Sequence, residues 1–143
     1  VLNFSNSSIQ RGVATVSYGV AAGGAALGDL TGGGTNDKFF FEIVFGDLEG
    51  ATFAATVTDG TNTETVTETL EDGFSPFQKF SDFGAVDFMN VTSLIFTLDS
   101  EDVLSFDGTI GSISAVPVPA SGLLLLFGVG GIAAVGRRRR RAS

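Results

Sequence analysis

The side chains that could carry chemistry in this sequence are almost all carboxylates. The chain of 143 residues has 16 Asp and Glu but no His and no Cys. It therefore has no Ser-His-Asp triad, no Cys-His pair, no disulfide and no ordinary zinc site. Two carboxylates could still catalyse glycoside hydrolysis, with Glu42 and Asp87 or Glu64 and Glu68 as the pairs. Nothing in the sequence sets the separation of either pair, so we interpret the carboxylates as solvated surface and expect no enzyme.

The densest group of carboxylates lies in residues 99–107. Asp99, Glu101, Asp102 and Asp107 fall within nine residues, and calcium takes several oxygen ligands from loops of this kind. The spacing does not follow the order of an EF-hand loop, and the same residue types commonly form turns. A calcium site is therefore one hypothesis and a plain acidic loop is the other; no other cofactor is expected.

A glycan-binding module is the main alternative to a structural protein. Sugar-binding surfaces favour exposed Trp and Tyr, whose flat rings also carry a polar group. The chain has no Trp, one Tyr (Tyr18) and 14 Phe, most of which lie at core spacing. The composition therefore favours a structural or interaction protein.

Short strands separated by turn residues must position these side chains. Alternating apolar and polar residues predict strands at 1–9, 13–20, 39–45, 52–58, 61–70, 91–98, 103–106 and 109–115. The pattern is strongest at 39–45, where Phe39, Phe41, Ile43 and Phe45 share one face. With almost no helical pattern before the tail, residues 1–115 are predicted to form an all-β fold, an antiparallel β-sandwich. A short linker at 114–119 follows.

Two stretches between these strands have features of their own. Asp59-Gly60 predicts a tight hairpin turn, and the hairpin is expected at a sheet edge that Glu64 and Glu68 protect from pairing with other chains. A turn is predicted at 46–50. A loop that inserts its phenylalanines into the core is predicted at 73–90, with Phe74, Phe77, Phe80, Phe83 and Phe88.

Charge is divided unevenly along the chain. Residues 1–116 hold all 16 acidic residues against three basic ones, a formal charge of −13, whereas the tail has five Arg. The acidic portion disfavours binding to nucleic acid and to anionic lipid surfaces, so no nucleic acid partner is expected.

The first residue is Val1, and no basic segment followed by an apolar segment comes after it. We therefore expect that an export signal has been removed.

The tail combines two prolines, an apolar segment and a basic cluster. Pro117 and Pro119 favour an extended backbone. No charged side chain occurs from Gly122 to Gly136. As a helix, Ala120–Gly136 would be about 25 Å long, at the short end for a hydrocarbon core of about 30 Å, and arginines that reach the interface would make up the difference. The alternative is a buried C-terminal helix with a basic tag.

This order of segments resembles a PEP-CTERM sorting signal of the VPxPA type, with Val118 between the prolines where the founding motif has Glu. The resemblance implies export, transient membrane anchoring through residues 122–136, and processing near the prolines by an exosortase, a membrane-embedded transpeptidase-like enzyme. It also implies delivery to the cell surface or extracellular matrix and makes exopolysaccharide a candidate partner. The pattern over residues 83–96 resembles the terminal strands of jelly-roll-like domains in other PEP-CTERM proteins, which implies a jelly-roll-like sandwich. The sorting-motif residues are Val116, Pro117, Val118, Pro119, Ala120 and Ser121.

The basic cluster is expected to orient the chain in the membrane before processing. Its residues are Arg137, Arg138, Arg139, Arg140 and Arg141. By the positive-inside rule the cluster stays in the cytoplasm and residues 1–116 lie outside. A permanent single-span anchor is the alternative role of the tail.

Overall fold

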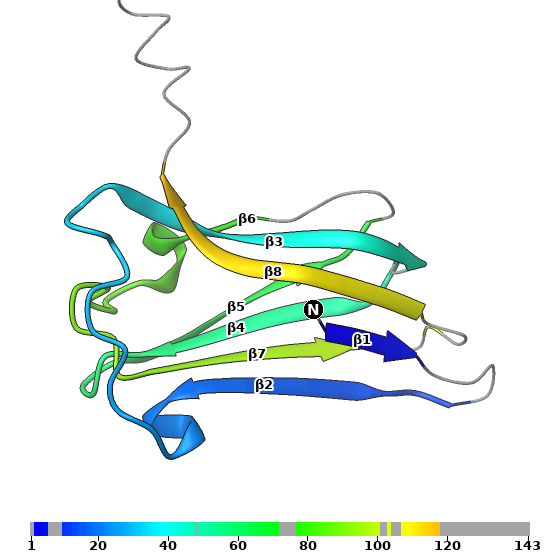
Figure 1. Ribbon diagram of the computed structural model, residues 1–143, viewed down its shortest axis with the longest axis horizontal. Helices are drawn as coiled ribbons and strands as arrows, with labels where there is room; N and C mark the ends of the chain where they lie inside the picture. Colours follow the sequence, from blue (N-terminus) through cyan, green and yellow to red (C-terminus); the bar gives the residue numbers. More distant parts are fainter. Residues whose placement is uncertain are drawn as a thin grey trace, which may run out of the picture.

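The chain folds into a sandwich of two antiparallel sheets (Figure 1). This computed structural model describes residues 2–5, 10–47, 49–71, 77–100, 103 and 107–117. Its strands are β1 (Leu2–Ser5), β2 (Val13–Gly19), β3 (Asn36–Asp47), β4 (Thr52–Thr58), β5 (Thr63–Thr69), β6 (Phe77–Lys79), β7 (Ser93–Asp99) and β8 (Asp107–Pro117). Two 3-10 helical turns, η1 (Val20–Ala22) and η2 (Phe80–Phe83), lie in the connections.

The strand order shows how the chain is wound. One sheet has the order β1-β8-β3-β6 and the other has the order β2-β7-β4-β5. The pairs β4–β5, β3–β6, β2–β7 and β1–β8 are nested, as in one long hairpin rolled upon itself, which is how a jelly roll is built. The all-β antiparallel sandwich expected from the sequence is confirmed.

Strand β3 is longer than its apolar pattern. The sequence predicted residues 39–45 and a turn at 46–50, but the strand spans Asn36–Asp47, so the turn begins later than expected. The reason is pairing: β8 runs beside β3 from Asp47↔Asp107 to Asn36↔Pro117 and provides ladder partners beyond the apolar core. Within the strand, Phe39 and Phe41 are buried, as the alternation predicted.

Phenylalanine rings fill the space between the sheets. Phe39 lies at the centre of this cluster, with five neighbouring rings at centroid distances of 5.0–6.4 Å. These neighbours are Phe41, Phe80, Phe83, Phe88 and Phe96. Edge-to-face and offset ring contacts of this kind add to the stabilisation from apolar burial. The core is therefore built without any disulfide.

The segment 73–90 only partly follows its prediction. Phe83 and Phe88 are buried and Phe80 packs against the core, which confirms the insertion of these rings; Phe74 lies outside the described residues. The prediction is wrong for Phe77, which is 46% exposed. Its position follows from the short strand β6, whose alternation points Gln78 into the core and Phe77 away from it.

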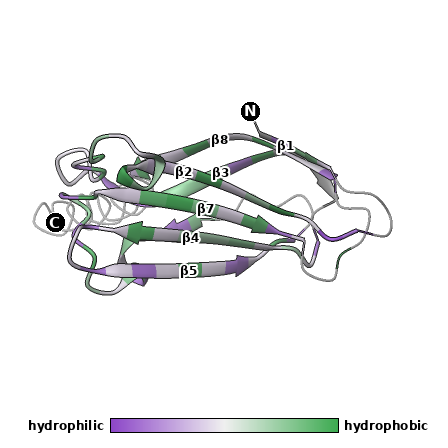
Figure 2. Cartoon of the chain, turned by 90° about the horizontal axis from the view of Figure 1, so that it is seen from below, coloured by the Kyte–Doolittle hydropathy of each residue, from purple (hydrophilic) through white to green (hydrophobic). Residues whose placement is uncertain are grey.

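The β4–β5 hairpin is wider than expected. Thr58 pairs with Thr63, so the loop has four residues rather than the two that Asp59-Gly60 predicted, and β5 starts at Thr63. Gly60 still has a positive φ of 92°. Strand β5 is a sheet edge, as predicted. In Figure 2 it is coloured mostly white and purple, whereas the inner strand β7 has long green segments.

The remaining boundaries shift by a few residues. β7 starts at Ser93 because Val91 forms an isolated bridge with Gly28. Val103 is not in a strand, which contradicts the strand expected at 103–106 for that residue; residues 104–106 lie outside the described part. No helix within the described ranges is long and apolar enough to cross a membrane. The predicted span 122–136 lies outside those ranges.

Candidate sorting-signal junction

The first two residues of the proline motif belong to the sandwich. Strand β8 continues through Val116 and Pro117, which pair with Lys38 and Asn36 of β3. Pro117 is exposed and is the last residue of the strand, a position where a missing N–H costs little. The described part of the expected linker, residues 114–117, is therefore strand rather than linker. Val118, Pro119, Ala120 and Ser121 lie outside the described residues.

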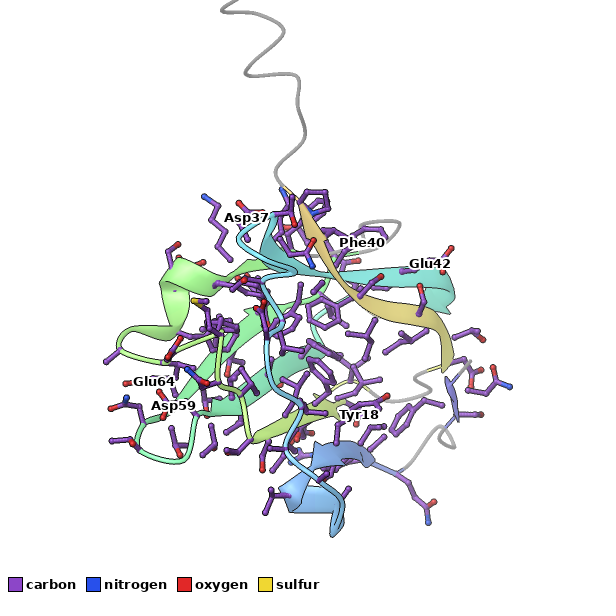
Figure 3. The ribbon with its side chains drawn as sticks, turned by 60° about the vertical axis from the view of Figure 1, so that its left-hand side comes forward. Tyr18, Asp37, Phe40, Glu42, Asp59 and Glu64 are labelled. Atoms are coloured by element: carbon purple, nitrogen blue, oxygen red, sulfur yellow. The ribbon has the colours of Figure 1, made fainter. Side chains whose placement is uncertain are left out.

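A bulge in β3 lies beside this strand end. The register shifts between Asn36 and Lys38, so Asp37 is the extra residue opposite Val116 and Pro117. One carboxylate oxygen of Asp37, Oδ1, is buried and has no hydrogen-bond partner in the part of the chain that the structure describes. Figure 3 places Asp37 and Phe40 close to the end of β8.

Comparison with family models decides what this junction is. Residues 115–141 match the model described as the PEP-CTERM protein-sorting motif. The chain carries a PEP-CTERM sorting motif. The motif implies export to the cell surface or extracellular space and processing by exosortase. No curated protein matches the chain, and no solved structure matches it either.

The matched region overlaps the folded domain. The PEP-CTERM match begins at residue 115, whereas β8 ends at Pro117. The sorting motif therefore starts inside the sheet, two residues after Ile113, which packs against the core. Residues Arg137 to Arg141 fall outside the described ranges, so their orientation stays a prediction.

A mainly apolar cavity lies beside the part of strand β8 where the sorting motif begins. It has a volume of about 220 Å³ and opens between the sheets, with Ile113 and Ala115 of β8 on one side and Tyr18 and Leu94 on the other. Its lining contains no carboxylate and no cationic side chain. Of the lining residues, Tyr18 and Ser114 have polar side chains and the others are apolar, so the cavity offers mainly packing surface.

The proposed calcium ligands come from two sheets. Asp99 ends β7 and Asp107 begins β8, so the chain crosses between the layers at this point. Glu101 and Asp102 lie outside the described residues. Among the residues that are described, no group of three or more potential metal ligands lies close together. The calcium hypothesis thus stays a prediction.

Two of the four carboxylates considered for glycoside hydrolysis accept hydrogen bonds from neighbouring residues. Glu42 accepts a hydrogen bond of 2.9 Å from Ser112 of the neighbouring strand. Asp87 accepts from the Met89 N–H at 2.9 Å and from the Asn90 side chain at 2.7 Å. Glu64 and Glu68 lie on the same strand, four residues and so about 13 Å apart, well beyond the separation that hydrolysis needs.

Sequence reasoning did not foresee the role of Asp59. Its carboxylate accepts hydrogen bonds from the N–H groups of Thr61, Asn62 and Asp87 at 2.7–2.8 Å, and from the Asn62 side chain at 3.0 Å. The Asn62 N–H, followed by that of Asp87, holds the pKa of Asp59 far below its usual range. The Asp59-Gly60 dipeptide indicated a turn, but the contact with Asp87 is visible only in the fold.

Proposed function

We propose that this protein is a non-enzymatic structural or interaction domain that its PEP-CTERM motif delivers to the cell surface or extracellular matrix. The observation that carries the proposal is the direct continuation of strand β8 into the matched motif. The absence of His and Cys from the sequence and the local hydrogen bonds of Glu42 and Asp87 support a role without catalysis.

We further propose that the tail acts in two steps. Residues 122–136 reside in the membrane while Arg137 to Arg141 hold the chain end in the cytoplasm. The exosortase then cuts the chain near the prolines and separates the acidic domain from its basic tail. The processed domain would carry a formal charge of −13, since all acidic residues precede residue 117.

The sheet limits where the cut can fall. Residues up to Pro117 are paired with β3, and a processing enzyme needs an extended segment that is not held in a ladder. The proposed cut therefore lies after Pro117, at a position the described residues do not reach.

The intact mass of protein recovered from the native cell surface or medium tests this proposal. The expected mass corresponds to a chain that ends after Pro117, with or without an attached remnant. A mass that includes Arg137 to Arg141 would overturn the processing step and make the tail a permanent anchor. A mass that ends before Val116 would contradict the proposed protection by the β3–β8 ladder.

Replacing the five tail arginines by Gln tests the orientation step. We expect disturbed topology and less processed product, because the positive charge that retains the chain end in the cytoplasm is lost. The matched control replaces the same residues by Lys and keeps the charge. Unchanged processing and topology in the Gln variant would refute the role of the cluster, provided that circular dichroism shows a folded domain in both variants.

A further inference from the structure

Two lysines face each other on the outside of the sheet that leads into the sorting motif. Lys38 of β3 and Lys79 of β6 are direct partners in the antiparallel register. Their neighbours in the next pair, Phe39 and Gln78, are buried, so both lysines point to the outer face. Like charges directly opposite one another destabilise a sheet. An anion bound from outside would offset the repulsion between the two ammonium groups.

Two phenylalanines lie beside these lysines on the same outer face. Phe40 pairs with Phe77, and their ring centroids are 5.1 Å apart. The Lys38 ammonium lies 4.8 Å from the centroid of the Phe77 ring, and Phe77 is 46% exposed. Most other phenylalanines in the described ranges pack in the core. We name Lys38, Phe40, Phe77 and Lys79 the Lys–Phe patch.

The patch adjoins the point from which the sorting motif leaves the sandwich. Val116 is the register partner of Lys38, and Ser114 is the register partner of Phe40. Both therefore share the outer face with the patch. In Figure 3, Phe40 of the patch is labelled near the end of β8, and Glu42 lies farther along β3.

We propose that the Lys–Phe patch rests on an anionic lipid surface while the chain is anchored by its tail. This inference builds on the membrane step of the proposed function and adds the orientation of the domain. The lysines would contact lipid phosphates, and the exposed Phe77 ring would enter the apolar side of the headgroup region. Basic and aromatic side chains together are typical of surfaces that bind at a membrane interface.

The acidity of the whole domain does not oppose this contact as strongly as its total charge suggests. Charges farther away than a Debye length of about 8–10 Å are largely screened at physiological salt. Glu42 lies four residues from Lys38 along β3, about 13 Å away. Asp37, with one oxygen buried, and Asp82 of η2 are nearer in the chain to the patch. Asp47 of β3 and its register partner Asp107 of β8 lie at the other end of the sheet, about 30 Å from Lys38. The local charge of the Lys–Phe patch is therefore positive, whereas the net charge of the domain is negative.

Because the tail tethers the domain to the membrane, even a weak affinity of the patch for lipid is enough to orient the domain. A tail in the bilayer keeps the domain at the membrane surface, so the patch acts at a high effective concentration. Of the three basic residues before the tail, two are in the patch and only Arg11 lies elsewhere. A glycan surface would also use exposed rings, but it would not require paired lysines, so the charges favour anionic lipid.

A tryptophan scan of the full chain tests the inference, because the chain has no Trp of its own. Phe77→Trp places the probe in the patch. Val13→Trp is the control, since Val13 is 61% exposed in β2 of the opposite sheet. Both variants are reconstituted in vesicles of phosphatidylcholine with brominated lipid, either with or without phosphatidylglycerol. We expect several-fold stronger quenching of the Phe77→Trp signal when phosphatidylglycerol is present, and no change for Val13→Trp.

Charge variants and high salt distinguish lipid binding by the patch from lipid binding by the tail. Lys38→Glu with Lys79→Glu, made in the Phe77→Trp chain, should remove the effect of phosphatidylglycerol, whereas Arg11→Glu should keep it. High salt should remove it from the chain with all lysines intact, which tests the charge dependence without a patch substitution.

The outcomes distinguish this inference from the proposed function. If the chain does not float with vesicles in a density gradient, the anchored step fails and the inference fails with it. If it floats but quenching is equal in both vesicle types, only the inference is overturned. A shift of the Phe77→Trp emission on adding soluble polysaccharide, without an effect of phosphatidylglycerol, would also overturn it and indicate a glycan site.

Discussion

At the scale of single residues, Asp59 ties two loops together. Its carboxylate accepts N–H groups from its own turn and from Asp87, 28 residues later. Asp29 has a similar but purely local arrangement, with bonds from Thr31 and Gly33. Both contacts favour the charged carboxylate, so the pKa of Asp29 is lowered chiefly by the Thr31 hydroxyl and that of Asp59 chiefly by the Asn62 N–H.

The lowered pKa of Asp59 in the folded protein predicts that the effect of Asp59→Asn on stability depends on pH. A lowered folded-state pKa contributes stability that is complete above the ordinary pKa of 3.8. The contribution is lost as the pH falls through the lower folded-state value. We therefore expect the variant to have a lower Tm than the unmodified chain at pH 7, and the gap to narrow below about pH 4. Thermal melts of both chains over a pH series measure this difference in Tm.

Asp29→Asn is the matched control for that experiment. Its hydrogen bonds reach no farther than Gly33, four positions along the chain, so we expect a smaller loss of Tm at pH 7. An equal loss in the two variants would contradict the bridging role of Asp59. So would a gap between Asp59→Asn and the unmodified chain that stays constant down to pH 2.

At the scale of elements, the edge strand β5 is built against further pairing. Glu64 and Glu68 pair in register with the buried residues Val57 and Phe53 of β4. Their side chains therefore lie on the core-facing side of the sheet, with Val66 between them against the core. Charges that point inward at an edge are costly to bury, so another strand cannot add there easily.

Replacing both glutamates by Val should promote self-association. The variant would present a continuous apolar face at an open edge, and we expect a several-fold larger oligomeric fraction by size-exclusion chromatography with light scattering. The control is Thr65→Val with Thr67→Val, on the outer face of the same strand. If the two variants associate equally, apolar content rather than inward charge governs the edge.

At the scale of the whole molecule, one aromatic cluster holds the two sheets together. Phe39 is 2% exposed and contacts rings from both sheets and from η2. Its neighbour Phe40 lies on the outer face and contacts Phe77. Adjacent residues of one strand therefore serve different purposes, the first in the core and the second on the surface.

Truncating these neighbours should separate the two roles. Phe39→Ala is expected to lower the free energy of unfolding by about 3–5 kcal/mol, as for other large buried rings. Phe40→Ala should cost about 1 kcal/mol or less, since surface changes have small effects. Urea unfolding followed by circular dichroism gives both values. Equal losses would mean that Phe40 is as much a part of the core as Phe39.

The sequence alone determined the fold class, the main strands and the sorting motif. These are carried by local patterns: alternation at Phe39 and Phe41, branched residues in β4, and a fixed order of prolines, apolar residues and arginines. Each pattern can be detected without knowing which segments are neighbours, because periodicity and composition are properties of a single stretch.

Only the tertiary structure decided how far the strands extend and which side chains lie opposite one another on paired strands. The length of β3 follows from its pairing with β8, which also draws Val116 and Pro117 into the sheet. The outward position of Phe77 depends on β6, a strand of three residues that forms only because β3 offers an edge. Lys38 and Lys79 are 41 positions apart in the chain, and register between distant strands is set by the packing of the whole sandwich rather than by either segment.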